Sequence, residues 1–256
     1  MVLTLVQIEV FLLILARIAG LFIETPVLNA KTFPSSGKTA LAIWISIIML
    51  FFVPYSHNPV NNPVVMVFLI INEVAIGFLI GFVCQILFGA VQAAGEIVDL
   101  QMGLSIASAF DPSTGAVTSI VGKLFFYLAL VMFVMLNGHH MVLSAVYQSF
   151  RVIPVGTFIH ISGNLVTQLT MLVASMLLIA LQLAVPALLL IFLFDFSLGI
   201  ISRVAPQVNV FQLGFQMKPT IGLIAILFST PFLITHISNM IAQMIQEIIK
   251  LLYNLI

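Results

Sequence analysis

Apolar residues fall into long blocks separated by short segments rich in proline, glycine and charge. The blocks cover residues 3–23, 40–53, 64–91, 124–146, 165–201 and 221–252. Continuous apolar runs of this kind favour helices of membrane-spanning length, and the pattern therefore predicts an all-α chain. The last two blocks are too long for one simple crossing and contain Pro186 and Pro231, so we expect kinked helical hairpins there.

Composition assigns these helices to a membrane. The 256 residues are 62% hydrophobic and 6% charged, with a formal net charge of zero, and the mean hydropathy is +1.27. A soluble protein of this size would need far more polar surface, so we predict a polytopic integral membrane protein with 1–256 as one membrane-embedded domain. Cys84 is the only cysteine, which excludes a disulfide or a cysteine-based metal site within the chain.

The segment 95–125, between the third and fourth blocks, has a different composition. Small residues follow Gly95, and the turn-forming Asp111 and Pro112 precede Gly115. Apolar residues run through the segment and argue against disorder. We therefore expect a buried loop here.

Ionisable residues inside the apolar blocks include Glu9, Arg17, Glu73 and Asp195. Such groups are costly in hydrocarbon, so each is a candidate functional residue. Two hypotheses remain open: pairing and packing within an assembly, which we favour, and a proton relay through Glu73 and Asp195 in a small-molecule carrier. In the block 64–91, which also contains Glu73, Gly77 and Gly81 form a small-residue face. Such a face predicts close contact with another helix.

Catalytic and metal-binding patterns are weak. His139 and His140 are adjacent, so their side chains diverge on a helix, and we interpret them as part of a polar helix end. Ser105 taken together with one of these histidines is a distant match to an intramembrane serine hydrolase. In such an enzyme a glycine is expected directly after the serine, and Ile106 stands there instead. We expect no enzyme, no cofactor and no metal, and keep the hydrolase as a third alternative.

Five short motifs, taken in order, resemble the family of the flagellar export-gate protein FliR and its virulence counterpart SctT. They are GEIVDLQMGLS at 95–105, Asp111-Pro112, Asn137-Gly138-His139, IPVG at 153–156 and LGIISRVAPQ at 198–207. Each motif is modest alone, but their order and spacing over nearly the whole chain are specific. The flagellar branch is the preferred interpretation and the virulence SctT branch is the alternative.

The resemblance implies a fold, partners and a location. One such subunit joins several copies of FliP and FliQ in a closed helical assembly of tilted hairpins, with a FliP-like front half and a FliQ-like rear half. Unfolded flagellar proteins leave the cytoplasm through it, and FlhB and the remaining export apparatus are further expected partners. The expected location is the bacterial inner membrane at the flagellar basal body, in contact with lipid and without nucleic acid.

The resemblance also implies a pore plug at 106–122. Its gating residues are Phe110, Asp111, Pro112, Gly115, Val117, Ile120 and Val121. Residues 95–125 were already expected to form a loop, so the two interpretations agree on this stretch. Glu73, Gly77, Gly81 and Asp195 are the residues expected to serve helix packing and assembly.

Overall fold

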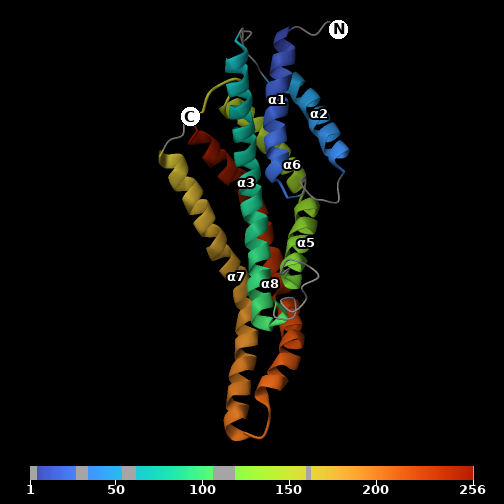
Figure 1. Ribbon diagram of the computed structural model, residues 1–256, viewed down its shortest axis with the longest axis vertical. Helices are drawn as coiled ribbons and strands as arrows, with labels where there is room; N and C mark the ends of the chain where they lie inside the picture. The colour runs from blue at the N-terminus through green and yellow to red at the C-terminus, as the bar shows by residue number, and fades with distance from the viewer. Residues whose placement is uncertain (1–4, 27–33, 54–61, 106–118, 160–162, 256) are drawn as a thin grey trace. The chain divides into compact units, whose positions relative to one another are not determined.

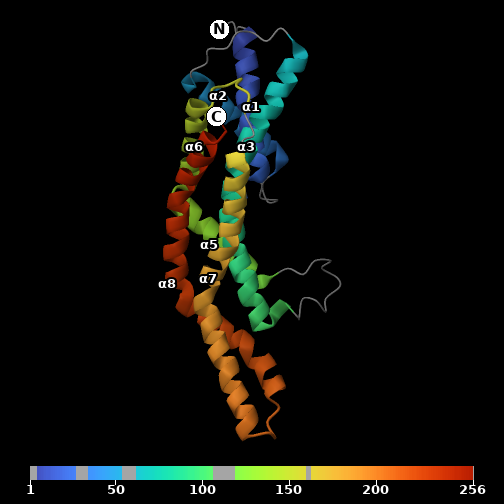
Figure 2. The same cartoon turned by 90° about the vertical axis from the view of Figure 1, so that its left-hand side faces the viewer.

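A computed structural model describes residues 5–26, 34–53, 62–105, 119–159 and 163–255 (Figures 1 and 2). Its long helices are α1 Leu5–Glu24, α2 Ser35–Phe52, α3 Pro63–Met102, α5 Ile120–Met135, α6 Gly138–Val152, α7 Gly163–Val204 and α8 Val210–Tyr253. These ranges contain no β-strand, which confirms the all-α prediction for the described chain. Five of the helices are long and apolar enough to cross a membrane, or up to six if α5 and α6 form one broken span. The chain is a polytopic membrane protein.

The apolar block at 124–146 differs from the expected single helix, because it is divided between α5 and α6. The two helices meet at an angle of 70°. Asn137 stands at the break with φ of 57°, and its carbonyl accepts the backbone N–H of His140 at 2.9 Å. Asparagine adopts this left-handed conformation more readily than most side chains. The polar Asn137-Gly138 pair therefore starts a new helix, which confirms that the histidine doublet lies at a helix end.

The two proline-containing blocks form continuous helices. α7 passes through Pro186, and α8 passes through Pro219 and Pro231. The hairpin expected within each block is therefore wrong. A hairpin forms instead between the two helices, at the turn 205–209, where both views show α7 and α8 running antiparallel (Figures 1 and 2). An isolated proline removes one backbone hydrogen bond, and bonds on either side maintain a long helix.

The helices belong to two compact units. The first comprises Met1–Leu87, Asn137–Val173 and Ile241–Ile256, and the second comprises Phe88–Leu136 and Ala174–Met240. Helices α3, α7 and α8 contribute residues to both units. The expected single domain over 1–256 stays a prediction.

In the first unit, α1 and α3 are in backbone contact (Figure 1). A Cβ atom on Gly77 would lie 1.9 Å from the carbonyl oxygen of Arg17, and one on Gly20 would lie 2.2 Å from the carbonyl oxygen of Val74. A Cβ atom on Gly81 would approach the carbonyl oxygen of Leu21 to 2.9 Å. The small-residue face of α3 thus packs on α1 of the same chain, and only glycine allows this approach.

In the second unit, the C-terminal part of α3 packs on α5 and α8. The ring centroid of Phe88 lies 5.5 Å from that of Phe133 and 5.7 Å from that of Phe126, which gives the unit an aromatic core. The side chain of Met102 packs directly against Gly222. A Cβ atom on Gly222 would lie only 2.3 Å from Met102 Cγ. These contacts fix the last turn of α3 in position.

Candidate functional site

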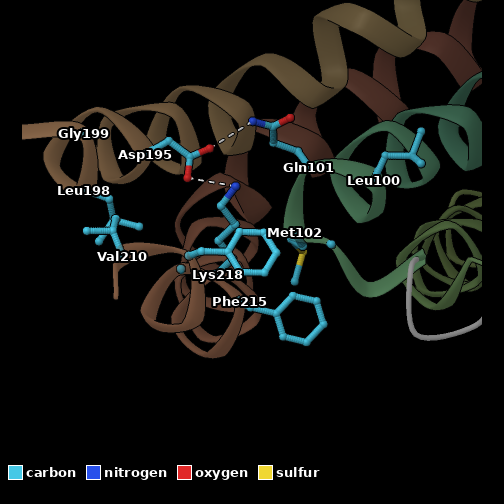
Figure 3. Close-up of a pocket in the computed structure, with 12 residues that line it drawn as sticks. Leu100, Gln101, Met102, Asp195, Leu198, Gly199, Val210, Phe215 and Lys218 are labelled. Atoms are coloured by element: carbon cyan, nitrogen blue, oxygen red, sulfur yellow. Dashed lines mark hydrogen bonds and ion pairs between the residues drawn. The ribbon is translucent and has the colours of Figure 1, made fainter. Parts of the chain in front are cut away.

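A cavity of about 770 Å³ lies in the second unit, between the end of α3 and the α7–α8 hairpin (Figure 3). The Asp195 Oδ1 atom lies 3.0 Å from Lys218 Nζ, and Gln101 Nε2 donates to Asp195 Oδ2 at 3.4 Å. The ion pair is partly accessible, because its side chains are 28% and 30% exposed. The apolar walls of the cavity include Leu100, Met102, Leu198, Val210, Phe211 and Phe215. Sequence analysis singled out Asp195 but not its partner Lys218.

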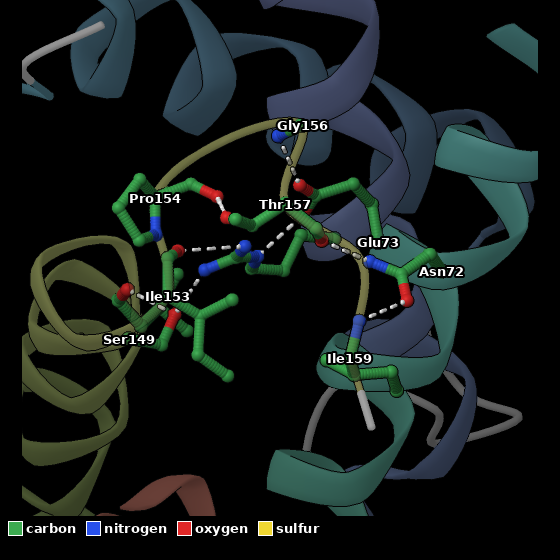
Figure 4. A network of polar contacts seen from close by, with 10 residues as sticks. Asn72, Glu73, Ser149, Ile153, Pro154, Gly156, Thr157 and Ile159 are labelled. Atoms are coloured by element: carbon green, nitrogen blue, oxygen red, sulfur yellow. Dashed lines mark hydrogen bonds and ion pairs between the residues drawn. The ribbon is translucent and has the colours of Figure 1, made fainter. Parts of the chain in front are cut away.

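The first unit holds a fully buried polar cluster around Arg17 (Figure 4). Arg17 Nε donates to Glu73 Oε2 at 2.6 Å, Nη1 donates to Ser149 Oγ at 3.0 Å, and Nη2 donates to the carbonyl of Ile153 at 3.1 Å. The guanidinium carbon lies 4.1 Å from the ring centroid of Phe150. Every nitrogen of the guanidinium has a partner, which is the condition for burying such a cation.

The cluster extends to the segment that follows α6. Glu73 Oε1 accepts the backbone N–H of Gly156 at 3.1 Å (Figure 4). Beside it, Asn72 Nδ2 donates to the carbonyl of Thr157 at 2.7 Å, and Asn72 Oδ1 accepts the N–H of Ile159 at 3.1 Å. One turn of α3 therefore holds the chain at 156–159, and Arg17 of α1 holds Ile153 at the start of the IPVG motif.

This geometry is that of a structural ion pair. Glu73 is 0% exposed, one of its oxygens binds a cation and the other binds a backbone N–H. Sequence analysis identified Glu73 and Arg17 as costly intramembrane charges without pairing them. Asn72 and Ser149, which complete the cluster, were not predicted from the sequence.

A third polar centre lies at Asp99, whose side chain is buried at the end of α3. Its Oδ2 atom accepts the hydroxyl of Ser105 at 2.7 Å, and its Oδ1 atom accepts the backbone N–H of Val121 at 3.2 Å. Ser119 caps α5 by accepting the N–H of Gly122 at 2.8 Å. One carboxylate thus connects the residues on either side of 106–118.

Most of the expected plug residues fall outside the described residues, namely Phe110, Asp111, Pro112, Gly115 and Val117. Ile120 and Val121 lie in the first turn of α5, where Ile120 is exposed and Val121 is buried. Residues 95–102, expected as part of a loop, continue α3 as helix. The reason is close packing: a Cβ atom on Gly95 would lie 2.6 Å from the Val121 carbonyl oxygen, so this glycine serves helix contact.

The remaining candidate residues are the two adjacent histidines and the cysteine. His139 and His140 lie in the first turn of α6 with ring centroids 4.3 Å apart. Cys84 is buried with its Sγ 3.6 Å from Met244 Sδ. Among the described residues, no group of three or more His, Cys, Asp or Glu side chains is arranged to hold a metal ion.

Curated relatives match the chain over most of its length. It is 29% identical to the flagellar biosynthetic protein FliR of Bacillus subtilis over 94% of both chains. It is 32% identical to FliR of Escherichia coli over 91% of this chain and 92% of the relative. The secretion system apparatus protein SsaT of Salmonella typhimurium is 29% identical over 66% of this chain and 65% of the relative. Residues 8–244 match the family described as Bacterial export proteins, family 1, and the chain therefore belongs to that family.

Proposed function

We propose that this protein is the FliR-type subunit of a flagellar protein export apparatus. The observation that carries the proposal is the match to proteins named for flagellar biosynthesis over 94% of both chains. In the proposed assembly the subunit joins FliP and FliQ in the bacterial inner membrane at the flagellar basal body. FlhB and the rest of the export apparatus are further partners, and unfolded flagellar proteins are the substrates.

Helix length supports an assembly that extends beyond a lipid bilayer. α7 has 42 residues and α8 has 44. At about 1.5 Å per residue each exceeds 60 Å, roughly twice the hydrocarbon thickness of a bilayer. Large apolar residues are nevertheless exposed along both helices, including Leu177, Leu181, Leu189, Phe192, Leu227 and Phe228. Neighbouring subunits and lipid are the surfaces that would cover them.

The proposed pore plug at 106–122 is supported by the contacts of Asp99. A plug needs a fixed base, and Asp99 binds both Ser105 and Val121 from a buried position. Together with the cap at Ser119, these bonds hold the two ends of the segment close to α3. The gating role of the residues between them rests on the resemblance alone.

The alternatives are less well supported. The virulence branch is represented by SsaT, whose similarity covers 66% of this chain, compared with 91% or more for the flagellar relatives from Escherichia coli and Bacillus subtilis. A proton relay needs carboxylates that exchange protons with an aqueous path. Glu73 is instead fully buried against Arg17, which favours the structural role.

Co-purification tests the proposal. The tagged chain is produced together with FliP and FliQ, solubilised in detergent, and the mass of the intact particle is measured. We expect one particle containing all three proteins, and we expect the chain to restore motility to a cell that lacks its own FliR. Isolation of the chain without FliP and FliQ, together with proton-coupled uptake by the chain alone in liposomes, would establish the carrier instead. Rescue of a virulence secretion mutant, and not of motility, would establish the SctT branch.

A further inference from the structure

We propose that the cavity around Asp195 and Lys218 binds the zwitterionic headgroup of a phosphatidylethanolamine molecule, with its acyl chains along the apolar wall. This lipid site goes beyond the export function. Its volume of about 770 Å³ is within the usual range of small-molecule sites. The occupant must match an ion pair at one side and a hydrocarbon surface at the other.

The polar side of the cavity complements a headgroup that carries both charges. Asp195 and Lys218 contribute one negative and one positive charge, and Gln101 adds no net charge. The ammonium of Lys218 has three donors, of which the bond to Asp195 uses one, and a carboxylate oxygen accepts more than one hydrogen bond. A lipid phosphate can bind Lys218 while the lipid ammonium binds Asp195. A purely anionic headgroup would meet the carboxylate without compensation.

The position of the cavity along the hairpin also suits a headgroup. Asp195 lies about two and a half helical turns before the end of α7, and Lys218 lies about two turns after the start of α8. The end of the hairpin exposes polar residues, namely Arg203 in the last turn of α7 and Gln207 and Asn209 in the turn that follows. A helical hairpin end that carries such residues is expected at the membrane–water interface, where headgroups lie.

The apolar side offers room for acyl chains. Leu100, Phe211 and Phe215 are 66%, 85% and 52% exposed, although all three line the cavity. Two glycines line this side of the cavity, and a Cβ atom on Gly103 or Gly199 would meet no atom of the described residues within 4 Å. Gly199 therefore keeps part of the cavity open.

The test measures lipid bound to the full chain in its solubilised complex. The complex is stripped of lipid in detergent, and phosphatidylethanolamine or phosphatidylglycerol is added before native mass spectrometry. We expect a phosphatidylethanolamine adduct on the wild type and its loss in Gly199→Leu, because leucine fills the cavity without a backbone clash. Gly163→Leu is the matched control, since a Cβ atom on Gly163 also meets no atom within 4 Å in the part of the chain that the structure describes, and Gly163 is not among the residues that line the cavity. It should retain the adduct.

Two further variants examine the headgroup contacts. Asp195→Asn and Lys218→Met should each abolish the preference for phosphatidylethanolamine over phosphatidylglycerol. Equal binding of the two lipids by the wild type, or an undiminished adduct in Gly199→Leu, would overturn the proposal. A photo-crosslinking amino acid at Phe211 gives a second readout. Cross-links to lipid support the site, and cross-links only to another protein subunit overturn it.

Discussion

The Nε atom of Arg17 on α1 lies 2.6 Å from the Oε2 atom of Glu73 on α3, and neither side chain is exposed. The two residues are 56 positions apart in the sequence. Their contact joins α1 to α3, and through Ser149 and Ile153 it also joins both helices to the end of α6.

Glu73→Gln should strongly destabilise the protein. The substitution keeps the shape of the side chain but leaves the guanidinium of Arg17 buried without a counter-charge, which costs about 3–5 kcal/mol. Thermal unfolding of the detergent-solubilised complex and its yield from membranes measure the loss. Export should fall in proportion to the amount of intact complex.

The double variant Arg17→Met, Glu73→Leu serves as the control for Glu73→Gln. Because it removes both charges, it should cost less than the sum of the two single substitutions. Abolished export at a normal amount of complex in Glu73→Gln would contradict the structural role and favour proton transfer.

Asp195→Asn should have a much smaller effect on stability. The ion pair with Lys218 is 28–30% exposed, and partly hydrated pairs contribute about 1 kcal/mol or less. The same unfolding assay compares Asp195→Asn with Glu73→Gln. If both variants lost equal stability, the accessible pair at Asp195 would have a structural weight that its exposure does not explain.

Gly77→Ala and Gly81→Leu should impair assembly. A methyl group at Gly77 would overlap the Arg17 carbonyl, and a leucine at Gly81 would displace α1 near Leu21 and Thr25. Overpacking of this kind costs about 1–3 kcal/mol or more. The yield of complex that co-purifies with FliP and FliQ measures the effect.

Gly163→Leu provides the comparison for these glycine variants, because no atom of the described residues lies within 4 Å of its Cβ position. Its yield should equal that of the wild type. A wild-type yield of Gly81→Leu would show that the α1–α3 contact tolerates a bulky side chain, and the packing hypothesis would be wrong.

Deletion of residues 113–118 should leave assembly intact and make the closed complex leak. The bonds from Asp99 to Ser105 and Val121 lie outside the deletion, so the base of the proposed plug remains in place. Apolar residues that fill a narrow lumen exclude water and ions, and their removal should raise conductance in a planar bilayer. Partial export should persist.

Asp99→Ala tests the base of the plug separately. Loss of the carboxylate removes both anchoring hydrogen bonds, and we expect a smaller rise in conductance than the deletion produces. Unchanged conductance in the deletion variant at normal complex yield would mean that another element closes the pore.

The helical membrane architecture follows from the amino-acid sequence alone. Apolar runs require backbone hydrogen bonds to be satisfied inside each segment, and a composition with 6% charged residues leaves a membrane as the environment. The ordered motifs also identify the family. These properties depend on local composition and on the spacing of residues along the chain, so they can be predicted from the sequence.

Which charged residues pair with one another depends on the packing of the helices. Arg17 pairs with Glu73, Asp195 pairs with Lys218, and Asp99 binds Val121, although no local spacing relates the members of these pairs. Each pairing depends on which helices lie in contact. Close approach at glycines and the burial of neighbouring side chains determine those contacts.

The positions of helix ends also depend on both the local sequence and the packing of the helices. Pro186 was expected to interrupt a helix and lies inside one, whereas Asn137 ends a helix within an apolar block. A proline removes one hydrogen bond, which the rest of a 42-residue helix outweighs, while a left-handed residue redirects the chain by 70°. Local signals thus mark possible breaks, and the packing of the surrounding helices selects the break that forms.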